Sequence, residues 1–261
     1  MLSRAKGRRR KRLEGMDIVS AAVLTATVLV IAFPFYTALI TSFTTNASYI
    51  RNPVQLIPMS FTLENYTYIF ERMNILTGYQ NTLFIALIGT AFSMLISLTY
   101  AYGLAAKDYP GKRLFFIYLL VTMYFGGGLI PTYLLIRDLG LVNNKMGIVF
   151  LCGVSPFYII IIKNGLEQLP ESLMESARVS GANEWQVFTH ITIPLIMPIV
   201  VTFSLFIAVN YWNEWFWSMI SLTRPAQKTL QVMLRTIVTT METLEMDSAA
   251  SDYAEVFTQG L

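Results

Sequence analysis

A polar stretch of the sequence, residues 163–193, carries the side chains best suited to grip another protein. After Lys163 it holds four carboxylates and only one cation, Arg178. A protruding carboxylate such as that of Glu175 can form a charge-assisted contact with a basic partner residue, which fixes register and transmits movement. Because an acidic segment is poorly suited to an anionic lipid surface, we favour protein docking over an interfacial helix.

A second group of polar and aromatic residues lies inside the last long apolar segment. Amide and carboxylate groups beside aromatic faces suit sugar rings, whose hydroxyls need hydrogen-bond partners. A carboxylate at membrane depth is also a candidate functional group, because leaving it unpaired in lipid is costly. Tryptophan and tyrosine equally serve as interfacial anchors, so substrate contact and anchoring both stay open. The residues concerned are Asn210, Trp212, Asn213, Glu214 and Trp215.

The remaining sequence offers little chemistry of its own. Cys152 is the single cysteine, which excludes an intrachain disulfide, and His190 is the single histidine, which excludes paired-histidine zinc motifs. The sequence contains no phosphate-cradling G-x-x-x-x-G-K-[ST] motif. We therefore expect a non-catalytic chain without a metal or cofactor, driven by another polypeptide.

Membrane helices must position these groups. The sequence is 54% hydrophobic and 13% charged, whereas a soluble domain carries about a quarter charged residues. Five apolar stretches are long enough to cross a bilayer, and helices satisfy their own backbone hydrogen bonds in lipid. The sequence thus predicts an all-α, polytopic transmembrane bundle. The expected spans lie near Ile18–Ile40, Asn81–Ala106, Leu114–Ile136, Met146–Ile162 and Ile193–Leu222.

Charge distribution predicts the orientation of the transmembrane domain, residues 18–261. Seven of the nineteen lysines and arginines fall in the N-terminal tail, residues 1–17, and positive residues prefer the cytoplasmic side. A cytoplasmic N-terminus places the loop 41–78 and the C-terminal segment 221–261 outside. The same parity places 163–193 inside, as a cytoplasmic coupling loop.

The coupling loop is predicted to fold as two short helices around a glycine. Proline is tolerated in a first helical turn, so one helix begins after Leu169 at Pro170. Gly181 permits a left-handed turn, and Pro194 is expected to end the second helix. Two bent amphipathic helices form a knob able to fill a groove in a partner. The residues assigned to this knob are Leu173, Glu175, Ala177, Gly181, Ala182, Trp185, Phe188 and Pro194.

The segment Leu169–Pro198 resembles the EAA loop of ABC import permeases, with Ser176 and Ser180 replacing the usual alanine and aspartate. By this loop a permease subunit grips its ATPase. The resemblance covers nearly the whole chain and is greatest to carbohydrate-uptake permeases similar to the smaller permease of the maltose importer. The glycine run Gly126–Gly128 most resembles the oligosaccharide and lipoprotein-associated branch. Further matching stretches are Asn65–Thr67, Phe125–Tyr133 and Leu139–Asn143.

This resemblance implies a type I ABC importer permease fold in a bacterial plasma membrane. It implies a second homologous permease, two cytoplasmic ABC ATPases that bind ATP and Mg, and an extracellular solute-binding lipoprotein that delivers a carbohydrate of oligosaccharide type. Such permeases usually have a sixth span, which this sequence lacks, so we expect a truncated chain. Nucleic-acid binding is not expected. The alternative is an ion-coupled carrier of a small polar solute, which predicts several intramembrane ionisable residues, whereas Glu214 is nearly alone.

The topology can be tested by cysteine labelling. In a Cys152→Ser background, the Ser180→Cys variant should react with a membrane-impermeant maleimide only from the cytoplasmic side. A cysteine placed in the loop 41–78 serves as the external control. Labelling of position 180 only from outside would overturn the predicted orientation.

Overall fold

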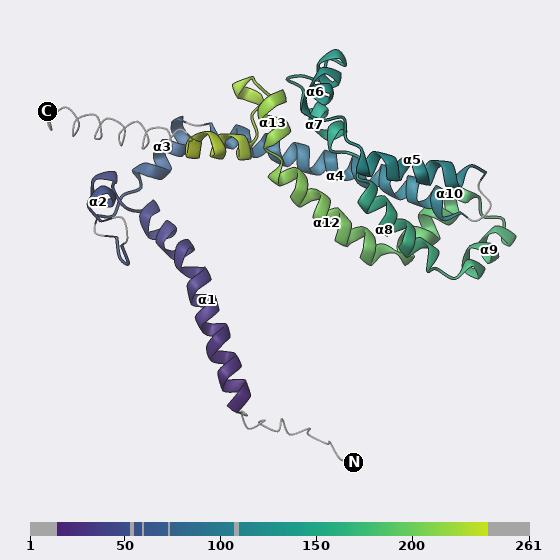
Figure 1. Cartoon of the computed structure of the whole chain (residues 1–261), viewed down its shortest axis with the longest axis horizontal. Coiled ribbons are helices and arrows are strands. Elements are labelled where there is room, and N and C mark those ends of the chain that lie inside the picture. Colours follow the sequence, from purple (N-terminus) through teal and green to yellow (C-terminus); the bar gives the residue numbers. More distant parts are fainter. Residues whose placement is uncertain (1–14, 53–54, 59, 73, 107–109, 240–261) are drawn as a thin grey trace. The chain divides into compact units, whose positions relative to one another are not determined.

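A computed structural model of the chain describes residues 15–52, 55–58, 60–72, 74–106 and 110–239 (Figure 1). These residues form helices and connecting segments, with one isolated bridge between Thr44 and Phe61. The predicted all-α class is therefore confirmed. Most of the predicted basic tail and the end of the C-terminal segment lie outside the described residues. The chain divides into two units, Met1–Met73 and Asn74–Leu261.

The first unit holds one long apolar helix and a small folded loop. Helix α1, Gly15–Ser42, contains the predicted first span and is long and apolar enough to cross a membrane. In the predicted external loop, α2 (Asn46–Arg51) and α3 (Glu64–Arg72) follow. The Asn65 side chain donates to the Ser42 and Thr44 carbonyl oxygens, and so ties α3 to the end of α1.

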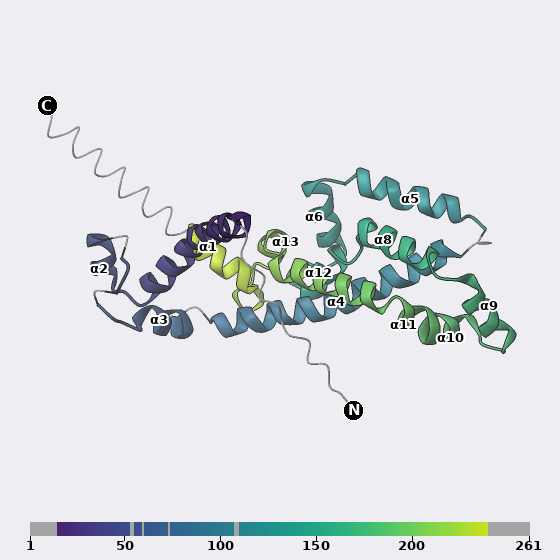
Figure 2. The same cartoon turned by 90° about the horizontal axis from the view of Figure 1, so that it is seen from below.

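The second unit is organised around α4, Ile75–Ala105, a helix of 31 residues. Figures 1 and 2 show α4 alongside α8 (Pro156–Glu167) and α12 (Met197–Asn213), and these helices pack together. The buried core draws apolar side chains from all three, including Ile85, Ile159 and Ile207. Burial of this apolar surface holds the three helices as one bundle.

The other predicted spans are bent helix pairs, not continuous helices as expected. By length and composition, two helices could cross a membrane alone, or five if each bent pair is one span, which agrees with the predicted number. The bends are 114°, 54° and 81°. In chain order the pairs are α5 (Lys112–Tyr124) with α6 (Leu129–Asp138), α7 (Lys145–Leu151) with α8, and Glu184–Leu195 with Met197–Trp212.

Glycine and proline explain where these helices break. Gly126–Gly128 separates α5 from α6, and Gly128 has a φ of 78° that favours glycine. A Cβ at Gly126 or Gly128 would meet nothing within 4 Å, so no other described segment packs closely against these two glycines. Their role in the described residues is to break the helix. Pro156 and Pro198 lie in the first turns of α8 and α12, where the missing amide is tolerated.

The predicted C-terminal segment returns to the N-terminal end of α4. It follows α13 (Phe216–Ser221), which falls within the predicted fifth span, and contains a 3-10 turn at Pro225–Gln227 and the apolar helix Leu230–Thr239. The buried Asn81 side chain donates to the Ala226 and Lys228 carbonyl oxygens, and the Leu230 amide donates to Thr82 Oγ1 at 2.9 Å. These polar contacts pin the segment to α4.

Two glycines of α4 provide a matched stability test. A Cβ at Gly89 would stand 2.5 Å from the Tyr211 ring, whereas one at Gly103 would meet nothing within 4 Å. We expect Gly89→Ala to destabilise the protein by about 1–3 kcal/mol through overpacking. Gly103→Ala should be neutral or slightly stabilising, because alanine favours helix. Thermal unfolding in detergent measures both, and equal melting temperatures for the two variants would contradict the packing described.

Candidate functional site

The predicted two-helix turn is present in the coupling loop. Helix α9, Glu171–Val179, follows Pro170 and has Glu171 in its first turn, where the helix dipole favours a carboxylate. Gly181 has a φ of 91°, as expected for a left-handed turn. The Ala182 amide donates to the Ala177 carbonyl and the Gly181 amide to the Arg178 carbonyl, both at 3.0 Å. This Schellman arrangement stops α9 and reverses the chain.

The second arm differs from its prediction. It starts at α10, Glu184–Gln186, where Asn183 and Gln186 form a capping box, and continues as a π-helix, Val187–Thr192, into α11, Ile193–Leu195. Pro194 was expected to end this helix, but it lies inside α11, and the chain bends at Ile196. Within the arm, which is one helix from Glu184 to Leu195, Pro194 donates no amide hydrogen bond, and the helix ends one residue after it.

The assigned residues of this hairpin, defined as residues 169–195, divide into an outward knob and an inward anchor. Glu175 and Gly181 are exposed, and Trp185 is 63% exposed. Leu173 is also exposed, while Ala177 and Ala182 are half-buried. Phe188 is only 5% exposed and belongs to the core of the bundle. Phe188 therefore anchors the hairpin, and the other side chains remain available to a partner.

An ion pair closes the turn and joins it to α4. Arg178 Nε donates to Glu184 Oε1 at 2.7 Å, and the Tyr102 hydroxyl donates to Glu184 Oε2 at 2.9 Å. Hydrogen bonding to Glu184 raises the pKa of Arg178, so the pair stays charged. The Tyr102 ring also packs against Phe188, with centroids 4.8 Å apart. We call Tyr102, Arg178 and Glu184 the latch.

Sequence reasoning missed the latch and one knob residue. Opposite charges flanking Gly181 at positions 178 and 184 were a usable signal, but nothing in the sequence brought Tyr102 of α4 to them. Val179, at 90% exposure, is the most exposed large apolar side chain of the hairpin. It adds apolar surface next to Glu175.

A cavity of about 600 Å³ separates the hairpin from the ends of α4 and α8. Lys112 and Lys163 both pair with Glu167 at its edge, at 3.6 and 2.7 Å. The hairpin is thus held at the latch and at Phe188 and is not packed flat on the bundle. This leaves the outer side of α9 free.

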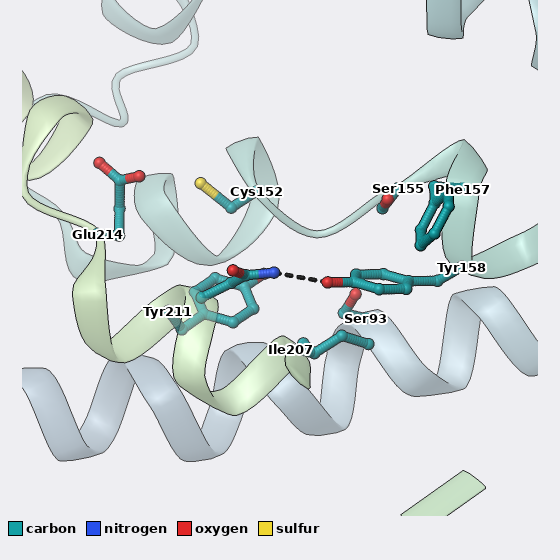
Figure 3. A pocket seen from close by; sticks show the side chains of 9 residues that line it. Ser93, Cys152, Ser155, Phe157, Tyr158, Ile207, Tyr211 and Glu214 are labelled. Atoms are coloured by element: carbon teal, nitrogen blue, oxygen red, sulfur yellow. Dashed lines mark hydrogen bonds between the residues drawn. The ribbon is translucent and has the colours of Figure 1, made fainter. Parts of the chain in front are cut away.

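A smaller cavity of about 260 Å³ lies within the bundle, between α4, α7, α8 and α12. Figure 3 shows Glu214 and Tyr158 on opposite sides of it, with Cys152 and Tyr211 between them. Asn210 Nδ2 donates to the Tyr158 hydroxyl at 2.6 Å, and Glu214 Oε1 accepts from the Trp217 amide at 2.7 Å. Its lining is Ser93, Cys152, Ser155, Phe157, Tyr158, Ile207, Asn210, Tyr211 and Glu214.

Amide, hydroxyl and carboxylate groups beside aromatic rings equip this cavity for a hydroxyl-rich ligand. Among the residues that the structure describes, no cluster of histidine, cysteine or carboxylate side chains could hold a metal. The polar groups of the lining suit hydrogen bonding to a ligand.

Only two of the five predicted substrate-path residues, Asn210 and Glu214, line this cavity. Trp212 packs edge-on against Tyr79, with ring centroids 5.5 Å apart, and Trp215 lies against another cavity described below. Asn213 is exposed. The missed lining residues Ser93, Ser155 and Tyr158 come from other segments, so their spacing in the sequence gave no signal.

Comparisons with known proteins agree with this architecture. Residues 114–243 match the family described as binding-protein-dependent transport system inner membrane component. The polygalacturonan/rhamnogalacturonan transport system permease protein YtcP of Bacillus subtilis (strain 168) is 36% identical over 85% of this chain and 78% of its own length. Protein LplC of the same organism is 34% identical over 85% and 75%.

A solved structure is also similar. It is described as a bacterial ABC transporter involved in the import of the acidic polysaccharide alginate. One of its chains matches with a TM-score of 0.80 and 32% identity, over 85% of this chain and 79% of that chain. The similarity therefore extends over most of both molecules.

The latch can be tested by hydrogen exchange. We expect Glu184→Gln to reduce amide protection across residues 177–187 by about two- to fivefold, since exposed ion pairs contribute at most about 1 kcal/mol. Glu175→Gln, which removes a carboxylate outside the latch, should leave protection unchanged. Equal protection in both variants would show that the latch does not order the turn.

Proposed function

The chain belongs to the binding-protein-dependent inner membrane permeases of ABC importers, and we propose that it forms, with a second homologous permease, the path of a carbohydrate through the bacterial cell membrane. A permease of this family is a multi-pass, non-catalytic subunit of the inner membrane. Family membership argues against the alternative of an ion-coupled carrier, because these systems depend on a binding protein and an ATPase.

The hairpin is the proposed docking element for the ATPase. Its exposed Glu175 carboxylate and Trp185 ring suit a groove that has basic and apolar walls. In this proposal the N-terminus and the hairpin face the cytoplasm, where two ATPase subunits bind ATP and Mg. The observation that carries the proposal is a protruding knob that the latch holds to the longest helix of the bundle.

The latch supplies a route for movement. When ATP binding closes the two ATPases, the hairpin is drawn along, and Tyr102 and Phe188 pass this displacement to α4. Because α4 packs against α8 and α12, its shift changes the cavity that those helices enclose. Hydrolysis then resets the arrangement. This is alternating access driven by a partner.

The proposed cargo is an oligosaccharide delivered by an extracellular solute-binding lipoprotein. Related permeases named for polygalacturonan and rhamnogalacturonan, and for arabinooligosaccharides in Bacillus subtilis, support this class. The cavity of Figure 3 supports it independently, because Asn210, Tyr158 and Glu214 offer donors and acceptors beside aromatic faces. We propose that Asn210 and Glu214 contact the sugar there.

Removing the knob charge should uncouple transport from ATP. In proteoliposomes containing the assembled importer, we expect Glu175→Gln to lower ATP-dependent uptake about tenfold, the value of one charge-assisted contact. Gly181→Val should act similarly, because its φ disfavours a branched side chain. Glu64→Gln, in the predicted external loop, is the control. Unchanged uptake in both hairpin variants would refute the docking assignment.

A further inference from the structure

A third cavity, of about 270 Å³, lies between Trp215 and the helix Leu230–Thr239. Gln231 and Arg235 are four residues apart, so they share one face of that helix. The Arg235 guanidinium carbon stands 3.7 Å from the centroid of the Trp215 ring, which is stacking contact. The remaining lining residues are Leu234, Val238 and Thr239. The helix thus presents a cation and an amide next to apolar side chains, and Trp215 lies opposite them.

Arg235 is an exposed cation without a carboxylate partner in the described part of the chain. Arg137, in contrast, pairs with Asp138 at 3.0 Å. Stacking on an indole uses the face of a guanidinium and leaves its N–H groups directed outward in the plane. That planar fork matches a carboxylate in a bidentate arrangement.

Two further lysines belong to the segment before this helix and to its contacts with α4. Lys228 lies two residues before the helix, and Lys145 donates to Asn81, the residue that holds the Lys228 carbonyl. Glu214 is the nearest carboxylate along the chain to Trp215, and it already accepts the Trp217 amide. The cavity lining itself holds one cation, Arg235, and no carboxylate, which favours an anionic ligand.

The two cavities are lined by consecutive residues, because Glu214 lines the cavity of Figure 3 and Trp215 lines this one. Both residues lie in the break between α12 and α13. Under the predicted topology this end of α4 faces outside, where a binding protein delivers its cargo. A ligand of several linked units could therefore contact both cavities.

We propose that the Arg235–Trp215 cavity binds the carboxylate of a uronic acid residue, so that the cargo class is an acidic oligosaccharide. This inference rests on the proposed carbohydrate transport. The Arg235 fork holds the sugar carboxylate, Gln231 hydrogen-bonds a ring hydroxyl, and Leu234 with Val238 covers the apolar C–H face. An acidic protein surface fits this site less well, because the Arg235 and Gln231 side chains lie in a small cavity.

The test is direct binding to the full-length chain in lipid nanodiscs. Equilibrium dialysis with labelled trigalacturonate is compared with its carboxyl-reduced neutral trimer at the same salt concentration. We expect the neutral trimer to bind at least about tenfold more weakly, because it lacks the charge-assisted bond. Arg235→Gln should weaken trigalacturonate binding by a similar factor, and Arg235→Lys by less, because it keeps the charge without the fork. Arg137→Gln is the matched control and should bind normally.

Three results would overturn the inference. These are equal binding of the two trimers, no binding of trigalacturonate to the wild-type chain, and an Arg235→Gln variant that binds like Arg137→Gln. Displacement of the trimer by polyglutamate at equal carboxylate concentration would instead favour an acidic protein partner. Since binding needs no ATPase, failure of the docking proposal would appear in the Glu175→Gln uptake assay and leave this result unaffected.

Discussion

The packing of α4 against α8 and α12 is the constraint on which the second unit depends. Its buried face supplies Ile85, Ala101 and Leu104 to the core, and the hairpin adds Phe188 at the same core. Polar groups then attach the remaining parts at the two ends of α4, through Asn81 and Thr82 at one end and Tyr102 at the other. Apolar burial holds the helices of the bundle together, and these polar contacts join the C-terminal segment and the hairpin to α4.

This division explains how a non-catalytic chain can serve an energy-driven process. The hairpin offers its partner an exposed surface, yet its anchor and latch reach the helix that lines the inner cavity. A displacement at the knob therefore has a short, packed route into the membrane-embedded part. Two of the three bent helix pairs contribute α8 and α12, which pack on α4, and the breaks of these pairs are places where backbone angles can change.

Apolar run length and turn chemistry carried most of what could be predicted from the sequence. The helical class, the start of α9 and the left-handed Gly181 all depend on local properties, and each is confirmed, whereas five spans are reached only if each bent pair counts as one. The bends at Ser155–Pro156 and Ile196 were missed because hydrophobicity alone cannot distinguish a broken span from a continuous one. The latch and the lining of the inner cavity were missed because they join residues 50 to 120 positions apart, which no periodicity reports.

The π-helical turn Val187–Thr192 has a consequence for how the hairpin tolerates changes of length. Its hydrogen bonds reach one residue further than those of an α-helix, so it holds one residue more per turn. Removing one residue there can restore an α-helix, in which about four residues cover the rotation that about five cover in the π-helical turn, so the chain before it keeps its direction. Trp185, which is exposed, would keep nearly its present direction while Phe188 stays buried. A one-residue deletion at this point is therefore absorbed, whereas a deletion in the regular helix α9 would rotate the chain beyond it by about 100°.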